Sequence, residues 1–300
     1  MRYRPIGSSG AAVSTLCLSL GRSHMAQGPA ALKDLIFAAL EQGINAYHLD
    51  CADADLLSAA GQAFSHVERR LLWVSLTLGS GGNFRERQGV FSPQSLRQTL
   101  EASLHTSKLG WIDVAVLDEP AENELPLSSL QALKAMRSSG QVRLLGIRGD
   151  SAIMDTYLST GAFDALFTPF SIEADWQIRS RLRAAQRRDM AIFIYDYQGK
   201  LELSAARPST ALPGRRSGLF GMMGRKSPID EAANHPFAFL HTMPSWTAEE
   251  ICLAVALTEP SVASALVGVF DRQRLEDLAK VPERHLPAGL SAQIEMARVG

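Results

Sequence analysis

The chain has 300 residues, of which 46% are hydrophobic and 20% are charged. These proportions are typical of a globular protein with a large core and exclude disorder over most of the chain. The net charge is −1, with charges of both signs scattered along the sequence, which argues against nucleic acid or an anionic membrane as a partner.

Three cysteines stand far apart, with no C-x-x-C pair. This spacing argues against a disulfide framework or a structural zinc site, and it fits a reducing cytoplasm. Two arginines followed by the apolar run 11–20 superficially resemble a secretory signal, but residues 21–24 make a poor cleavage site. No apolar run approaches the roughly 20 residues of a membrane-spanning helix. We therefore expect a cytoplasmic protein.

The chain begins with a predicted hairpin and strand over residues 1–20, followed by a helix at 30–41 whose apolar residues stand at helical spacing. A strand at 44–48 and a helix at 54–64 come next. Strands and helices continue to alternate, and the later elements are predicted as strand 71–77, a helix from Ser92, strand 112–117, helix 127–138, strand 142–147, helix 152–159, strand 164–168, helix 176–188, strand 191–195, helix 248–257, strand 263–267 and helix 272–280.

This order contains eight short apolar strands, each paired with an amphipathic helix. Such alternation implies parallel strands covered by helices, and eight units close most naturally into a (β/α)8 TIM barrel. A doubly wound open sheet is the alternative α/β fold. Residues 198–245, after the seventh strand, are too long for a simple connection and are expected to be a functional lid or disordered. A final helix across the barrel is expected after residue 282, and residues 1–300 are taken as one domain.

Three segments carry a resemblance to a known family. Residues 43–53 read GINAYHLDCAD and are similar to the motif G-I-N-x-F-D-T-A-x-x-Y; residues 1–10 and 133–147 resemble M-x-Y-R-x-L-G-x-S-G and L-x-x-L-x-x-x-G-K-I-R-x-I-G-V. In this order and spacing they resemble the aldo-keto reductase superfamily over nearly the whole chain. The resemblance implies the barrel and reduction of carbonyls with NAD(P)H. In that chemistry a tyrosine donates a proton, a lysine and an aspartate tune its acidity, and a histidine orients the substrate.

The residues at these four places differ from the family pattern. Without a gap, His48 stands at the aspartate place and Asp53 at the tyrosine place. A two-residue insertion after Asn45 instead places Asp50 at the aspartate position and Asp55 at the tyrosine position. Either alignment removes the proton donor.

The remaining two places lie at the ends of the next two strands. Leu78 stands where the lysine belongs, and an apolar side chain cannot lower a neighbouring pKa by charge. Asp118 stands at the histidine place. At least three of the four positions are therefore substituted.

Among the positions that the resemblance assigns to the nicotinamide cofactor, some match the family pattern and others are substituted. Arg148 lies where a serine and an asparagine hold the carboxamide, and Phe167 replaces a glutamine. Tyr195 matches the aromatic residue that stacks on the nicotinamide ring. Arg274 and Asp277 match an arginine and, loosely, a glutamate near the adenine site. Binding of NADP(H) or NAD(H) is thus an open expectation.

Several of these residues have possible roles other than those of the family. His48, Asp50, Asp53 and Asp118 are expected near the barrel mouth, where they would form an acid–base pair or, less in keeping with their spacing, a metal site; we predict no metal. Arg148 would bind an anionic group there or neutralise Asp118 and Asp53.

Two functional hypotheses remain. The first is a divergent aldo-keto reductase-like protein that is a ligand-binding or regulatory pseudoenzyme, with a small molecule in the barrel mouth. The second is an enzyme, either an oxidoreductase of that family or another acid–base catalyst, that uses His48, Asp50, Asp53 and Asp118. For the basic and apolar segment 215–226 there are three interpretations: it docks a protein partner, it closes over a nucleotide, or it is a solvated loop without such a role. The sequence predicts no oligomeric state.

Overall fold

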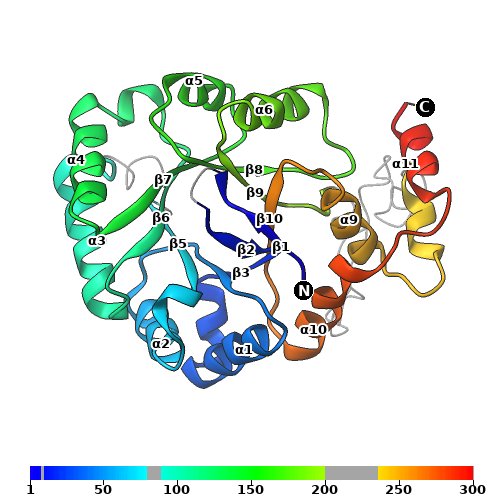
Figure 1. Cartoon of the computed structure of the whole chain (residues 1–300), viewed down its shortest axis with the longest axis horizontal. Coiled ribbons are helices and arrows are strands. Elements are labelled where there is room, and N and C mark those ends of the chain that lie inside the picture. The colour runs from blue at the N-terminus through cyan, green and yellow to red at the C-terminus, as the bar shows by residue number, and fades with distance from the viewer. Residues whose placement is uncertain (8–9, 80–88, 200–235, 300) are drawn as a thin grey trace, which may run out of the picture.

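A computed structural model of the chain describes residues 1–7, 10–79, 89–199 and 236–299. Eight parallel strands form a closed barrel in the order β10-β3-β4-β5-β6-β7-β8-β9 (Figure 1). The predicted TIM barrel is confirmed, and the doubly wound sheet is wrong because β10 pairs with β3 and closes the sheet. The strands are β3 (Leu16–Leu20), β4 (Ala46–Leu49), β5 (Trp73–Leu78), β6 (Ile112–Asp118), β7 (Val142–Arg148), β8 (Ala165–Pro169), β9 (Ala191–Tyr195) and β10 (Val262–Val267).

Helices surround the barrel, and their starts follow from capping residues. The Ser92 side chain accepts a hydrogen bond from the backbone N–H of Ser95, with Pro93 in the first helical position of α3. Thr247 and Glu250 form a capping box at the start of α9. The helices are α1 (Pro29–Glu41), α2 (Ala54–Phe64), α3 (Pro93–Ser107), α4 (Leu127–Ser138), α5 (Ile153–Thr160), α6 (Trp176–Gln186), α9 (Ala248–Ala256), α10 (Arg272–Lys280) and α11 (Leu290–Val299).

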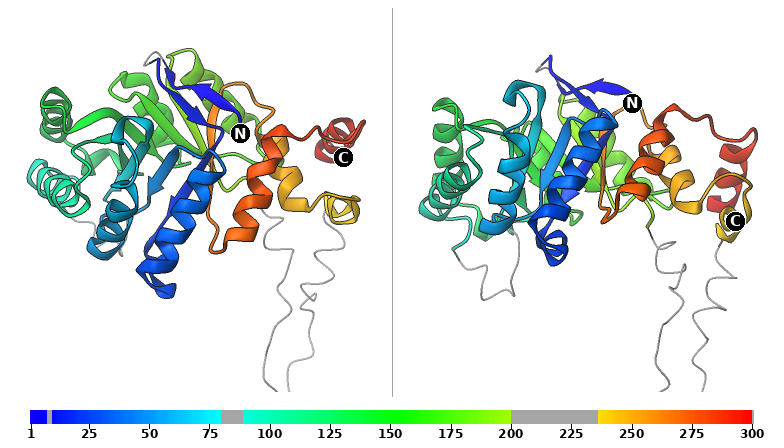
Figure 2. Two further views of the ribbon diagram at one scale, coloured as in Figure 1. Left: turned by 60° about the horizontal axis from the view of Figure 1, so that its bottom comes forward. Right: turned by 90° about the horizontal axis from the view of Figure 1, so that it is seen from below.

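The predicted N-terminal hairpin is present as the antiparallel pair β1 (Tyr3–Pro5) and β2 (Ala12–Ser14). It lies over one end of the barrel, at the start of the strands (Figures 1 and 2). Ile6 and Val13 are fully buried there and belong to the cluster of side chains inside the barrel. The hairpin therefore closes the N-terminal end and leaves the other end as the mouth.

Two apolar cores result from the alternation of side chains along each strand. The larger core lies between the strands and the helices. The smaller one fills the barrel and includes Phe167 and Phe193, whose rings stack with centroids 4.6 Å apart. Gly146 on β7 leaves room for the Phe167 ring, because a Cβ there would lie 3.4 Å from its Cε2 atom and 2.9 Å from Val114 Cγ1. The barrel is thus a packed core rather than a pore.

Parts of the connections differ from expectation or lie outside the described residues. The basic segment 215–226 and most of the predicted loop 198–245 lie outside them. The described end of that loop contains the short 3-10 helix η5 (Ala238–Thr242). The final helix α11 forms as predicted, but it lies beside the barrel rather than across it (Figure 1). Among the described helices, none is long and apolar enough to cross a bilayer.

Candidate functional site

The interior polar site nearest the mouth is built on His48 of β4. Its side chain is fully buried between two hydroxyl groups of β5, with Nδ1 2.8 Å from Ser75 Oγ and Nε2 3.1 Å from Thr77 Oγ1. Ser75 and Thr77 stand two residues apart, so both hydroxyls point to the same face of the strand. The two strands place them together because His48 lies opposite Ser75 in the parallel register.

One tautomer satisfies every hydrogen bond of this set. Ser75 Oγ donates to the carbonyl of Tyr47, at 3.3 Å, so it accepts the Nδ1 proton of His48. Nε2 is then the acceptor for the hydroxyl proton of Thr77. Burial, and secondarily the charge of Arg148, lower the pKa of His48 to about 3. His48 is therefore a neutral, fully hydrogen-bonded interior side chain and does not stand open at the mouth.

Leu78 does not face the interior. It is fully buried in the outer core, between the strands and the helices. Thr77 is the interior residue at the end of β5, since it contacts His48. The structure thus places Leu78, which the resemblance aligns with the lysine, on the outer face of β5, and the neighbouring residue that faces the interior is Thr77, a neutral hydroxyl.

Asp53 has a local structural role. Its Oδ1 accepts hydrogen bonds from the backbone N–H groups of Asp55 and Leu56 and so caps α2, while its Oδ2 pairs with Arg22 at 3.0 Å. The Leu56 N–H and, to a lesser degree, Arg22 lower the pKa of the Asp53 carboxyl. This carboxylate is tied to a helix start and a surface arginine, so Arg148 does not neutralise it.

Asp50 packs against the backbone of the preceding loop. A Cβ added to Gly21 would lie 2.1 Å from Asp50 Oδ2, so only glycine fits beside this carboxylate. The Oδ1 atom of Asp50 is buried and has no hydrogen-bond partner within the described ranges. Partial burial, followed by the Asp50 side chain, raises the pKa of Cys51 to about 11, so the thiol is a poor nucleophile.

Arg148 joins two other predicted residues at the mouth. Its Nε lies 3.9 Å from Asp118 Oδ1, and its guanidinium lies over the Tyr195 ring, 4.6 Å from the centroid. The side chains of Arg148 and Asp118 are 26% and 28% exposed, so both remain open to solvent. Burial raises the pKa of Tyr195 to about 12, although Arg148 opposes this shift.

Phe167 lies below this cluster, inside the barrel. It is fully buried, and its ring centroid is 5.3 Å from that of His48 and 4.6 Å from that of Phe193. Phe167, which the resemblance places among the cofactor contacts, is thus part of a stack of rings inside the barrel.

The two residues that the resemblance places near an adenine group form ion pairs within the protein. Arg274 pairs with Glu249 at 2.7 Å, and Glu249 also accepts hydrogen bonds from Tyr197 and Gln198. Asp277 is paired with Lys280 on the same helix. The side chain of Asp271 accepts a hydrogen bond from the Arg274 backbone N–H and caps α10.

The remaining contact of this region ties two loops together. The His24 ring stacks on Phe270, with centroids 4.4 Å apart, and its Nε2 lies 3.0 Å from the Val269 carbonyl oxygen. The loop after β3 is thus packed against the loop after β10. Within the described ranges, no group of three or more His, Cys, Asp or Glu residues is arranged to hold a metal ion.

No family profile matches the sequence, and no curated protein does. Solved structures do match: the aldo-keto reductase AKR11C1 from Bacillus halodurans superposes with a TM-score of 0.77 in its holo form and 0.73 in its apo form. The identity is 18%, and each match covers 99% of this chain and 96% of that one. The chain has the aldo-keto reductase fold. At this identity the likeness concerns the fold, so function must come from the residues.

The interior polar set on this aldo-keto reductase fold was missed in the sequence. Its signal is the alternation in residues 73–78, WVSLTL, where Ser75 and Thr77 stand on one face and Leu76 and Leu78 on the other. The Glu249 contacts had no such signal, because they join the residues after β9 to α9 and α10, which lie far along the sequence.

Proposed function

We propose that this chain is a ligand-binding or regulatory protein on the aldo-keto reductase fold and does not carry out conventional NAD(P)H-dependent carbonyl reduction. The observation that carries the proposal is the neutral, hydrogen-bonded set of His48, Ser75 and Thr77, which faces the barrel interior from β4 and β5. A phenol that protonates a carbonyl near neutral pH needs nearby charges that make it more acidic. A buried neutral imidazole and two hydroxyls provide no such charge.

Tyr195 does not replace the missing donor. Its pKa is raised to about 12, away from the range in which a general acid works efficiently near neutral pH. The guanidinium of Arg148 covers one face of its ring. Tyr195 is therefore better suited to shaping the mouth than to proton transfer.

The residues present do not fit a nicotinamide dinucleotide. Arg148 covers one face of the Tyr195 ring and so leaves a nicotinamide ring only the other, and Arg274 would have to leave Glu249 to reach a phosphate. Asp271 places a carboxylate at the N-terminus of α10, where a phosphate would otherwise gain from the free N–H groups. The proposed function therefore requires no NADP(H) or NAD(H).

Arg148 indicates the chemistry of the ligand. It is a partly exposed cation at the mouth, next to an aromatic ring, and its contact with Asp118 is long for an ion pair. A small molecule with an anionic group fits this arrangement. Neither nucleic acid nor a membrane is a proposed partner; a protein partner at residues 215–226 and a cytoplasmic location remain part of the proposal.

The test is a fluorescence titration of the purified full chain with NADPH and NADH, together with an NADPH-oxidation assay on a panel of aliphatic and aromatic aldehydes. We expect neither cofactor to bind at micromolar concentration and no oxidation above the protein-free rate. Saturable NADPH binding together with turnover of any aldehyde would overturn the proposal.

The alternative function is acid–base catalysis by the mouth carboxylates, and one observation favours it: Asp50 keeps a buried Oδ1 without a hydrogen-bond partner in the described part of the chain. If a substrate is found, Asp50→Asn and Asp118→Asn should each abolish turnover while the protein still folds. His48→Ala and Asp53→Asn test the other two groups in the same way. Full activity in all four variants would eliminate this alternative.

A further inference from the structure

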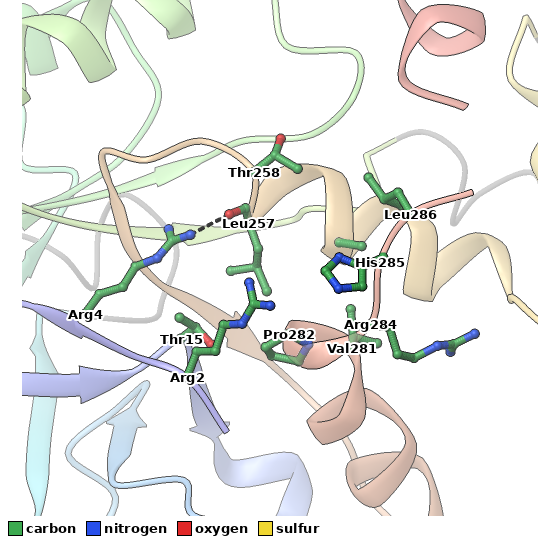
Figure 3. Close-up of a pocket in the computed structure, with 11 residues that line it drawn as sticks. Arg2, Arg4, Thr15, Leu257, Thr258, Val281, Pro282, Arg284, His285 and Leu286 are labelled. Carbon is green, nitrogen blue, oxygen red and sulfur yellow. Dashed lines mark hydrogen bonds between the residues drawn. The ribbon is translucent and has the colours of Figure 1, made fainter. Parts of the chain in front are cut away.

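A pocket lies at the N-terminal end of the barrel, away from the mouth (Figure 3). Its volume is about 270 Å³. One wall comes from the N-terminal residues Arg2 and Arg4 and from Thr15. The others come from the C-terminal end of α9 and from the 3-10 helix η6 (Val281–Glu283) with the residues that follow it. None of these residues belongs to the site at the mouth.

The lining of this pocket combines positive charge with apolar surface. Arg2, Arg4, Arg284 and His285 contribute the basic groups, and the apolar part comes from Ala254, Leu257, Val281, Pro282 and Leu286. Among the described residues that line the pocket, none is acidic. The nearby carboxylate of Glu283 already pairs with the amino group of Met1.

Two of the arginines already form hydrogen bonds or an ion pair with other residues of the protein. Arg4 donates to the carbonyl oxygens of Leu257, Glu259 and Val262, at the end of α9 and the start of β10 (Figure 3). The guanidinium of Arg284 lies 3.6 Å from the Trp246 ring centroid, pairs with Glu250 at 3.1 Å and points away from Arg2 (Figure 3). These two groups hold the walls of the pocket.

Arg2 is the cation that is left for a ligand. It stands two residues before Arg4, just ahead of β1, and both side chains line the pocket. Its side chain is exposed, and in the part of the chain that the structure describes it makes no hydrogen bond or ion pair, although its charge contributes, after the amino group of Met1, to lowering the pKa of Glu283. Burial lowers the pKa of Arg4, and the charge of Arg2 adds to this effect, which reflects repulsion between two neighbouring cations. An anion bound between them would offset that repulsion.

We propose that this pocket binds a small organic carboxylate with an apolar body. Arg2 holds the carboxylate, for which the planar guanidinium offers two parallel N–H donors. The side chains of Leu257, Val281 and Leu286 contact the apolar body. At about 30 Å³ for each water-sized group, the volume admits a ligand on the order of ten non-hydrogen atoms. A single unpaired guanidinium matches one negative charge.

The probe is benzoate, which has the proposed charge, shape and size. Isothermal titration calorimetry of the full chain at neutral pH compares it with benzamide, a neutral molecule of the same shape, and with acetate, which lacks the apolar body. We expect benzoate to bind at millimolar or lower concentration and each of the other two to bind at least about tenfold more weakly. Equal binding of benzamide, or no binding of benzoate, would overturn the proposal.

Two variants locate the binding. Arg2→Gln should weaken benzoate binding at least about tenfold, since it removes the charged hydrogen bonds. Arg97→Gln, on α3, is the matched control: Arg97 is also exposed and shows no partner among the described residues, so its loss should leave benzoate binding unchanged. Circular dichroism checks that both variants fold. Benzoate binding that survives in Arg2→Gln, or falls equally in both variants, would contradict the assignment.

Discussion

The Nε2 atom of His48 lies 3.1 Å from the hydroxyl oxygen of Thr77, inside the barrel and out of contact with solvent. Together with Ser75, these residues close a hydrogen-bonded set that needs no net charge. Because a buried charge is costly unless it is paired, the set also opposes protonation of the imidazole. The barrel interior at this place is therefore stable without a charged group.

The first prediction concerns the pH dependence of stability. The pKa of His48 is near its usual 6.5 in the unfolded chain and about 3 in the folded protein. Between these values the unfolded chain binds a proton that the folded protein does not, so the free energy of unfolding decreases as the pH falls below 6.5. The slope approaches about 1.4 kcal/mol per pH unit at most. Above pH 6.5 His48 contributes no pH dependence.

Urea unfolding of wild type and His48→Asn between pH 4.5 and 7.5 measures this contribution. The stability difference between the two should shrink as the pH falls, because asparagine keeps an amide for Ser75 but cannot take up a proton. His105→Asn, at an exposed histidine on α3, is the control for the loss of a histidine outside the buried set. A constant difference between wild type and His48→Asn would show that the imidazole titrates normally.

The second prediction separates capping from catalysis at Asp53. Asp53→Ala should lose about 1 kcal/mol of stability, because α2 loses its cap. Asp53→Asn should lose much less, since asparagine caps helices nearly as well. Thermal unfolding compares the two. If both variants lose the same stability, the hydrogen bonds to Asp55 and Leu56 are not the main role of this side chain.

The architecture could be predicted from the sequence because it depends on local patterns. Apolar strands and amphipathic helices alternate at short intervals, and residues such as Ser92 and Thr247 mark helix starts in the sequence itself. The strands therefore fell within a few residues of their observed bounds. The long segment after β9 has no such pattern, and most of it lies outside the described residues.

The site was harder to predict because it depends on which way side chains face. A shift of one residue exchanges the interior and exterior faces of a strand, so the resemblance alone did not show that Thr77 rather than Leu78 faces the interior. The engagement of Arg274 by Glu249 depends on a contact between α9 and α10, and no spacing in the sequence reveals it. The role of Asp53 as a cap was visible in the sequence, since aspartate immediately precedes the helix.

The third prediction concerns the packing of Phe167 against Gly146. Phe167→Ala should cost about 3–5 kcal/mol, because it leaves a cavity inside the barrel. Gly146→Ala should cost about 1–3 kcal/mol, because its Cβ would crowd Val114 and the Phe167 ring. In the double variant the new methyl group partly occupies the cavity, so urea unfolding should give a loss smaller than the sum of the single losses. Strict additivity would mean that the ring does not lie over Gly146.

The fourth prediction compares two aspartates near the starts of β6 and β8, the strands on either side of β7. Asp113 is fully buried and accepts hydrogen bonds from Arg69, Arg143, Trp111 and the backbone N–H of Val74. Asp164 accepts in a similar way from Arg137 and from the backbone N–H of Leu145, but its side chain is 34% exposed.

Asp113→Asn should therefore destabilise the protein by about 2–4 kcal/mol, because it leaves two guanidinium groups beside a neutral buried amide. The value lies below the full range for buried pairs since Arg143 is half exposed. Asp164→Asn, the matched control, should cost about 1 kcal/mol or less, as water replaces part of the lost interaction. Urea unfolding at neutral pH measures both. An equal loss in the two variants would contradict the view that burial sets the energetic weight of these networks.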